Sequence, residues 1–472
     1  MSELSSLSPK AVWYYFDLIC SIPHISKHES RLAQALGDEA KAAGLEVICD
    51  ESGNLIIKRP ASPGFEHLPR IIMQAHMDMV PASDHEFDFL TTAITPYIDG
   101  DVVRAKGTTL GADDGIGVAH AMAIMTDKEF KCGALTAILT VDEESGMSGA
   151  RNLAAEHLTG KYMLNLDGSD RGFCIGCAGG LRQEFTFTPE NVPAPAGRTL
   201  KFTLSGLPGG HSGLCIHEER GNALKFLAEF FDQQPEIKVA SINGGSADNA
   251  IPHQVEAIAV TELADNELKN LLAACTMLLK KECAGAKDMT FTVEAAPPAA
   301  QVWSDKFRTE LLSALTLAPN GVMDFDDGLG IVKTSSNLAT IRSFADKVIV
   351  RTSQRSLVDE CREEVAALVS THFELFHANS AKEDYYPATP PKHDAELLKI
   401  ATACAEKHGK TDSPYAIHAG LETGWFSMKN PELEIISCGP EHHDYHTPYE
   451  TLNIPSVAAF DTFLRELLVT LK

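Results

Sequence analysis

The segment His76-Met77-Asp78 follows an apolar run, Ile71 to Ala75, and brings an imidazole and a carboxylate to the end of a predicted strand. Residues two apart on extended backbone point to the same face, so Asp78 can orient the imidazole of His76, as carboxylates do for metal-bound histidines. A structural His–Asp pair is the alternative interpretation. The spacing suits a metal ligand supported by an acid.

Acidic residues gather in two further segments. Asp113 and Asp114 lie in Gly-Ala-Asp-Asp-Gly-Ile-Gly, where glycines allow close backbone approach and a helix follows. A helix start capped by aspartate would have the same composition. Asp142, Glu143 and Glu144 come at the end of an apolar strand. Three consecutive acids there repel one another and lose hydration unless cations neutralise them, although a solvated acidic turn is the competing explanation.

Two more segments add an acid and several histidines. Asp167 ends the strand-like stretch Tyr162 to Leu166, and the segment from Glu441 to Glu450 holds three histidines. The Thr-Pro pair after His446 would fix that imidazole in place, while a surface histidine cluster is the alternative. Carboxylates and imidazoles without thiolates match zinc, manganese or cobalt in a hydrolytic site better than a structural cysteine-bound zinc.

The elements that must position these groups alternate between helix and strand. The sequence predicts helices at 9–20, 29–43 and 116–125, and strands at 45–49, 54–58, 71–75 and 134–141. This alternation predicts an α/β domain with a mixed, mostly parallel sheet. Ligands collect at the carboxyl ends of the strands in such a sheet, which is where the acids and His76 fall.

Two proline clusters, which begin at Pro189 and Pro387, enclose a region whose sequence pattern differs from that of the first 188 residues. We predict one α/β domain in two parts, 1–188 and 387–472, and an inserted α+β domain over 189–386. Within the insertion, Asn249-Ala-Ile-Pro and Asn337-Leu-Ala-Thr-Ile each precede a strand-like run, which is a weak indication of two repeated halves.

The composition limits the partners. Of the 472 residues, 65 are acidic and 40 basic, giving a net charge of -25. Such a surface repels phosphate backbones and anionic lipids, so nucleic acid and membranes are poor partners. No run approaches the ~20 apolar residues of a spanning helix, and the polar N-terminus does not resemble a signal peptide. The 11 scattered cysteines are typical of reduced thiols, so we expect a cytoplasmic protein.

In order and spacing, the five segments resemble the M20 family of di-zinc metallopeptidases, and the chain is most similar to the aminoacyl-histidine (Xaa-His) dipeptidases within it. The resemblance covers the whole chain and implies a zinc-exopeptidase-like catalytic domain, 1–188 and 387–472, with the inserted domain, 189–386, as its lid. It also implies a role for each acid and histidine: His76 and Asp167 bind one metal, Glu144 and His446 the other, Asp113 bridges both, Glu143 is the general base and Asp78 orients His76.

Physical chemistry agrees with this division of metal-binding and general-base roles among the residues. Two metals ~3.5–4 Å apart can share one carboxylate and lower the pKa of a water between them towards ~7. The adjacent Glu143 and Glu144 cannot easily ligate one metal together, so one can bind while the other moves the proton of the water. We therefore expect two divalent ions per chain, zinc first, with cobalt or manganese as substitutes.

In the insertion, His211 in Gly-Gly-His-Ser-Gly resembles the family's lid histidine, which would stabilise the developing oxyanion. Asn249 matches the family's lid asparagine. Arg355 looks like the arginine that binds the carboxylate of the substrate, with Arg351 as the alternative. Glu422 is a candidate for the amine of the substrate. For the His211 segment, the alternative is a glycine-rich turn with an exposed histidine. For the Glu422 segment, the alternative is an ordinary glutamate at the start of a helix.

The sequence thus predicts a metallo-dipeptidase that hydrolyses dipeptides with a free N-terminus. A preference for C-terminal histidine, including β-alanyl-histidine, rests on the resemblance alone. A related metal-dependent aminoacylase or deacetylase and a non-catalytic metal-binding regulatory protein are the alternatives. A homodimer through the lid domain is one option, and with it His211 could serve its own site or that of a partner.

Overall fold

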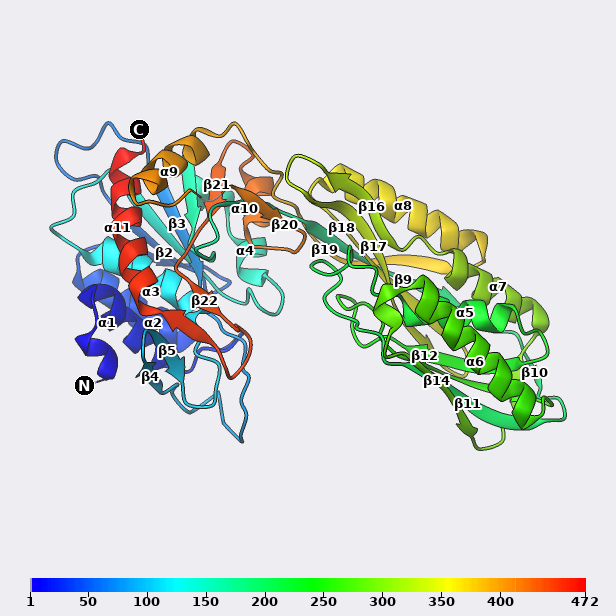
Figure 1. Ribbon diagram of the computed structural model, residues 1–472. Helices are drawn as coiled ribbons and strands as arrows, with labels where there is room; N and C mark the ends of the chain where they lie inside the picture. Colours follow the sequence, from blue (N-terminus) through cyan, green and yellow to red (C-terminus); the bar gives the residue numbers. More distant parts are fainter. Residues whose placement is uncertain (1, 412) are drawn as a thin grey trace. The chain divides into compact units, whose positions relative to one another are not determined.

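The computed structural model describes residues 2–411 and 413–472, and these form two compact units (Figure 1). Unit 1 comprises Met1–Cys177, Thr389–Ala416 and Leu421–Lys472, and unit 2 comprises Ala178–Ala388 and Ile417–Gly420. The first boundary lies before the proline cluster at 189, because β9 (Gly179–Phe187) already pairs in the sheet of unit 2. The short return at Ile417–Gly420 has no signal in the composition of the sequence.

Unit 1 is built on an eight-stranded mixed sheet in the order β1-β2-β6-β3-β7-β21-β8-β20. The central pairs β6–β3, β3–β7 and β7–β21 are parallel, and pairing on either side, β1–β2–β6 and β21–β8, is antiparallel. Every residue of β3, β6 and β7 is buried, as expected for central strands covered on both faces. The strands span Glu46–Cys49 (β1), Leu55–Arg59 (β2), Ile71–His76 (β3), Leu135–Thr140 (β6), Tyr162–Asn165 (β7), Cys174–Cys177 (β8), Tyr415–Ile417 (β20) and Glu434–Ser437 (β21).

The helices of unit 1 follow the predicted apolar patterns with small shifts at their ends. The predicted helix start at Pro9 is one residue early, since Pro9 caps α1 rather than opening it. Helix α3 is buried along nearly its whole length, and a Cβ at Gly115 would lie 3.3 Å from Ile19 of α1, so glycine there permits the close packing of α1 on α3. The helices span Lys10–Cys20 (α1), Ser30–Ala42 (α2), Ala112–Thr126 (α3), Ser148–Asn152 (α4), Glu396–Lys407 (α9), Thr423–Lys429 (α10) and Ile454–Thr470 (α11).

The histidine-rich segment forms a hairpin rather than a free loop. Strands β22 (His442–His443) and β23 (Thr451–Asn453) pair with each other, and β23 pairs with β5 (Val102–Ala105), which pairs with β4 (Pro96–Asp99). This small four-stranded sheet holds both ends of the segment that carries His446.

Unit 2 contains the same topology twice. Strands β11, β12, β13 and β14 with helices α5 and α6 form one βαββαβ half, and β9, β17, β18 and β19 with α7 and α8 form the other. In each half the spatial order of the four strands is fourth-first-third-second, and the halves join edge to edge through β12 and β17. The bounds are Arg198–Ser205 (β11), Ala223–Asp232 (α5), Lys238–Gly244 (β12), Val255–Thr261 (β13), Asp265–Glu282 (α6), Thr290–Ala295 (β14), Asp305–Leu317 (α7), Ile331–Ser343 (β17), Val348–Ser356 (β18), Asp359–Leu375 (α8) and Asn379–Tyr386 (β19).

The first half is inserted into the second. The antiparallel pair β10 (Asn191–Pro193) and β15 (Gln301–Trp303) brings the chain out of β9 and back to α7, and a single apolar core runs through both halves. The two asparagine segments are not equivalent, however. Asn249 lies in the loop before β13, whereas Asn337 lies inside the long strand β17.

The mixed sheet with its helices confirms the predicted α/β class with an inserted α+β domain. None of the helices within 2–411 and 413–472 is long and apolar enough to cross a membrane.

Candidate metal centre

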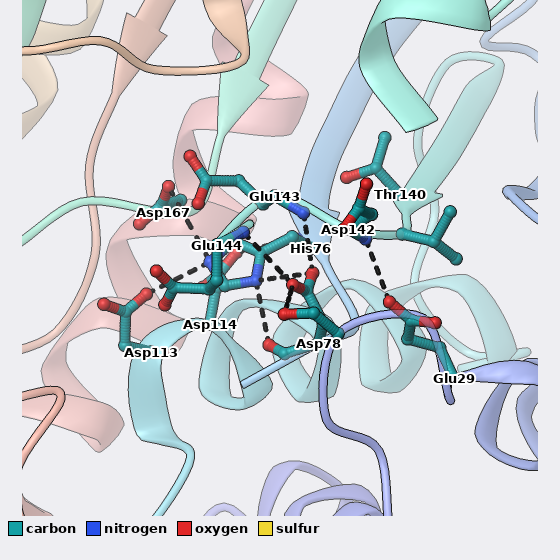
Figure 2. A network of polar contacts seen from close by, with 12 residues as sticks. Glu29, His76, Asp78, Asp113, Asp114, Thr140, Asp142, Glu143, Glu144 and Asp167 are labelled. Carbon is teal, nitrogen blue, oxygen red and sulfur yellow. Dashed lines mark hydrogen bonds and ion pairs between the residues drawn. The ribbon is translucent and has the colours of Figure 1, made fainter. Parts of the chain in front are cut away.

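The register of the central strands brings three of the predicted segments to one edge of the sheet. His76 is the last residue of β3 and pairs in register with Thr140, the last residue of β6, while Gln74 pairs with Asn165 at the end of β7. The chain beyond β6 carries Glu143 and Glu144, and the chain beyond β7 carries Asp167. Because parallel strands end at the same edge, these acids lie around a buried imidazole (Figure 2).

Asp113 links the two histidines. Its Oδ1 lies 3.1 Å from Nε2 of His76, and its Oδ2 lies 3.2 Å from Nε2 of His446. His76 Nε2 also lies 4.0 Å from Asp167 Oδ2, and His446 Nε2 lies 2.9 Å from Glu144 Oε1. Two groups of three ligand atoms, each within 4.8 Å of one another, therefore share Asp113: one with His76 and Asp167, the other with Glu144 and His446.

The donor atoms of the two groups are imidazole nitrogens and carboxylate oxygens, a set that suits zinc, cobalt or manganese. The close packing of buried carboxylates in these groups also indicates a bound cation. Burial, together with Asp113 and Glu144, raises the pKa of Asp167 to about 6. Burial, with Asp167 and Glu144 nearby, also raises the pKa of Glu143 well above its usual range. Divalent cations would relieve this repulsion and keep the acids ionised.

Glu143 lies beside these groups without a bonded partner for its carboxylate. Its side chain has no hydrogen bond or ion pair within the described part of the chain, although one oxygen comes within 4.8 Å of ligand atoms of His76 and Glu144. The backbone N–H of Glu143 donates to Asp78 Oδ1 at 2.9 Å. This arrangement leaves the Glu143 carboxylate available to exchange a proton.

Asp78 holds both the imidazole and the acidic loop. Its side chain accepts hydrogen bonds from the backbone N–H groups of Glu143 and Glu144 and from the Ser26 hydroxyl, at 2.8–3.1 Å. Nδ1 of His76 lies 3.5 Å from Asp78 Oδ1 and 3.0 Å from the backbone carbonyl oxygen of Asp78. Burial opposes ionisation of Asp78, but the interactions with His76 outweigh it and lower the pKa.

The neighbouring acids of the two acidic segments have different surroundings. Asp114 is buried, and its carboxylate accepts hydrogen bonds from the backbone N–H groups of His76 and Gly117, both at 3.2 Å. Asp142 accepts hydrogen bonds from the hydroxyls of Ser145 and Ser148 and so closes the turn after β6. Asp114 therefore stabilises the backbone, and Asp142 stabilises the turn after β6. The other three acids of the two segments, Asp113, Glu143 and Glu144, face the candidate metal centre.

Glu450 is a structural determinant of the centre that the sequence analysis did not single out. Its carboxylate is 1% exposed and accepts hydrogen bonds from the backbone N–H groups of four consecutive residues, 110–113, at 2.7–3.2 Å. It thereby fixes the loop that presents Asp113. The only signal in the sequence is its place four residues after His446.

Glu422 lies directly before α10 and is also 1% exposed. Its Oε2 accepts hydrogen bonds from Gln74 Nε2 and Thr140 Oγ1, both at 2.6 Å, and no partner for Oε1 lies among the described residues. Burial raises the pKa of Glu422 to about 8. These contacts attach Glu422 to the strands beneath the centre, and its contact with a substrate amine stays a prediction.

The residues predicted in the insertion lie within unit 2. The backbone of His211 pairs with Ala250, next to Asn249, and the backbone N–H of Ser212 donates to the Asn249 carbonyl oxygen at 2.8 Å. Burial and then Arg355 lower the pKa of His211 to about 4. The structure thus brings three predicted residues of unit 2 into one neighbourhood.

His418 is a fourth member of this neighbourhood that the sequence analysis missed. It lies in the return Ile417–Gly420, and its Nε2 is 2.7 Å from the Ser335 hydroxyl oxygen. Burial, with Arg355 and His211 nearby, lowers its pKa to about 3, so His418 is neutral at physiological pH. Only its closeness in sequence to Glu422 could have drawn attention to it.

The two candidate arginines differ in their partners. Arg351 donates to Glu184 at 2.8 Å and to Glu383 at 3.3 Å, so carboxylates already neutralise it. Arg355 is 5% exposed, donates to the hydroxyl of Tyr386, and has no carboxylate partner within the described residues; its Nε is unpartnered. A buried guanidinium without a counter-ion favours Arg355 as the group that binds an anionic ligand.

A cluster of carboxylates and imidazoles at the carboxyl edge of an α/β sheet, with a free acid beside it, defines a metal-dependent hydrolase. Residues 72–470 match the model of "Peptidase family M20/M25/M40", and the chain belongs to this family.

Two relatives match the whole chain. The cytosol non-specific dipeptidase of Escherichia coli (strain K12) is 36% identical over 479 residues, covering 99% of each chain. The crystal structure of aminoacylhistidine dipeptidase from Vibrio alginolyticus superposes with a TM-score of 0.89 at 39% identity, covering 100% of this chain and 98% of that one. A Staphylococcus aureus tripeptidase, with a TM-score of 0.63 at 16% identity and 98% coverage of each chain, shares the fold. The matches confirm the predicted family, the fold class and a hydrolase of the metallo-dipeptidase type.

We expect Glu450→Gln to lower the free energy of unfolding by about 3 kcal/mol, because the amide group replaces one acceptor oxygen with a donor facing two backbone N–H groups. Loosening of the Asp113 loop should also lower the metal content after dialysis. Urea denaturation and elemental analysis measure the two effects. The exposed Glu432→Gln is the matched control, and equal stability and metal content in both variants would contradict the role of Glu450.

Proposed function

We propose that this protein hydrolyses the peptide bond of dipeptides with a free N-terminus, with a preference for histidine at the C-terminal position. The observation that carries the proposal is Asp113, whose two carboxylate oxygens face two histidines that belong to two ligand groups. The names of the two full-length relatives support dipeptides as substrates, and that of the Vibrio alginolyticus protein supports histidine.

In this proposal two divalent ions, zinc first and cobalt or manganese as substitutes, are held by the two groups. His76 and Asp167 would hold one ion, Glu144 and His446 the other, and Asp113 would bridge both. When bound, such ions polarise the scissile carbonyl and lower the pKa of the attacking water. The donor set fits this chemistry because it contains imidazoles and carboxylates only.

The residues of the chain would then divide the remaining work. The carboxylate of Glu143 takes a proton from the attacking water and passes it to the nitrogen of the leaving amine. Asp78 keeps the His76 ring oriented through its contacts at Nδ1 and holds the backbone of Glu143 in place. Glu450 keeps Asp113 in position through the loop 110–113.

For substrate binding, we propose that the residues predicted in unit 2 have the roles that the family resemblance implies. Arg355 binds the terminal carboxylate, His211 donates a hydrogen bond to the developing oxyanion, and Asn249 contacts the substrate. The absence of a carboxylate partner for Arg355 in the described residues supports the first assignment, and the depressed pKa of His211 keeps its ring neutral at pH 7.

The remaining proposals concern location and assembly. We propose that the protein acts in the cytoplasm, which agrees with the name of the Escherichia coli relative. The homodimer through the inserted domain stays a prediction, which light scattering of the purified protein would test.

Removing metal tests the class of reaction. After chelation, hydrolysis of β-alanyl-histidine and alanyl-histidine should be abolished, and zinc, cobalt or manganese should restore it. N-acetylated dipeptides should react at least ~100-fold more slowly, because a site that binds a free amine rejects analogues that lack it. Faster cleavage of N-acylated amino acids would indicate an aminoacylase, and metal binding without any hydrolysis would indicate a regulatory protein.

Glu143→Gln tests the general base. The variant should keep both ions but lose a factor of ~10²–10⁴ in kcat, since an amide cannot accept the proton. Asp113→Asn is the contrasting variant and should lose metal as well as activity. Steady-state kinetics with elemental analysis separate the two, and normal turnover by metal-replete Glu143→Gln would remove Glu143 from the mechanism.

Arg355→Ala should lower kcat/KM for dipeptides by ~100-fold or more, because the substrate carboxylate loses a buried charged partner. Arg351→Ala is the matched control on the same strand, and its kcat/KM should change less than threefold. Dipeptide amides, which lack the carboxylate, should show little difference between Arg355→Ala and the parent. The assignment is wrong if Arg351→Ala shows the larger loss.

A further inference from the structure

Three metal-ligating side chains meet outside the centre described above. Cys404 lies in the last turn of α9, His408 is the C-cap residue directly after that helix, and Glu466 lies on α11. The two helices pack side by side in unit 1 (Figure 1). One ligand atom from each of the three residues lies within 4.8 Å of the other two. The mechanism proposed above uses none of them.

We propose that Cys404, His408 and Glu466 bind one additional zinc-class divalent ion per chain. A thiolate, an imidazole and a carboxylate are ligands that Zn²⁺ accepts in tetrahedral sites, and three protein ligands leave the fourth position for water. Cobalt and cadmium share this preference for mixed sulfur and nitrogen donors. The two predicted ions of the other centre have no sulfur ligand, so the two kinds of site differ chemically.

The geometry of the cluster is close to what an ion needs. His408 Nε2 lies 2.8 Å from Glu466 Oε2, and two ligands at zinc bond lengths lie about 3.3 Å apart, so a shift of about 0.5 Å admits the ion between them. The other oxygen of Glu466 accepts a hydrogen bond from Lys407 Nζ at 2.9 Å. That contact fixes the orientation of the carboxylate, as supporting partners do for metal ligands.

The three side chains of the cluster differ in their exposure to solvent. Cys404 is 1% exposed, whereas the side chains of His408 and Glu466 are 30% and 32% exposed. His408 also lines a cavity of about 80 Å³ together with Phe463 and Gly439. An ion can therefore enter from the open side and keep a water ligand, while the thiol lies sheltered from oxidants.

Binding at this cluster would be coupled to proton release. A metal ion binds cysteine as the thiolate, so binding at Cys404 would displace the thiol proton. The ion would also cross-link α9 to α11 and stabilise the folded chain by mass action. Without an ion, the Glu466 carboxylate is hydrogen-bonded to Lys407 and His408.

Cobalt substitution of the full-length protein tests the proposal. Chelated protein is titrated with Co²⁺, and ions per chain are counted after gel filtration. A sulfur-to-cobalt charge-transfer band in the near ultraviolet should appear, because Cys404 supplies a thiolate. Cys404→Ala and His408→Gln should each hold one ion fewer than the parent, and Cys404→Ala should lack the band. This difference of one ion does not depend on how many ions the other centre holds.

Cys49→Ala and Cys438→Ala are the matched controls, one exposed and one buried, and both should keep the band and the ion count. Dipeptidase activity and circular dichroism show that the variants are folded. The proposal is overturned if no charge-transfer band forms in the parent, if the band persists in Cys404→Ala, or if the parent and His408→Gln bind equal numbers of ions.

Discussion

The candidate metal centre of unit 1 is organised around a carboxylate shared between two imidazoles. Asp113 directs one oxygen to His76 and the other to His446, with Asp167 and Glu144 close by. So many acids in a buried place repel one another, and burial raises the pKa of Asp167 and of Glu143. The fold tolerates this arrangement because cations can neutralise it, which ties the stability of the centre to its chemistry.

Carboxylates that accept backbone hydrogen bonds hold this arrangement in place. The carboxylate of Glu450 accepts hydrogen bonds from the backbone N–H groups of residues 110–113. The carboxylate of Asp78 accepts hydrogen bonds from the backbone N–H groups of Glu143 and Glu144, and that of Asp114 accepts one from the backbone N–H of His76. Asp113 and Glu144 are thereby each held by a further acid, Glu450 and Asp78, that is not itself one of the proposed ligands. The excess of acids in the motifs thus has two functions, binding and positioning, which the same residue type performs in different surroundings.

The duplicated topology of unit 2 allows its two halves to be compared strand by strand. Arg355, the arginine proposed to bind the substrate, follows the segment of Asn337 and not that of Asn249. β13 and β18 are the third strands of the two βαββαβ halves, and Arg355 lies on β18. The corresponding strand of the first half, Val255–Thr261, has no arginine. The two halves therefore share a backbone pattern but differ in the side chains that could bind a ligand.

The sequence alone was sufficient to predict the parallel centre of the sheet, because buried strands such as Ile71–His76 are continuous apolar runs with chemistry at their ends. It also identified the acids and histidines of the centre by residue type and order. It could not assign Asp114 and Asp142 to backbone and turn, show how Glu450 is bonded, or find His418. Those distinctions depend on which partner each side chain meets, and the partners, such as Glu450 and the loop 110–113, are hundreds of residues apart in the chain. Only the tertiary structure brings them within hydrogen-bonding distance, so only it could decide.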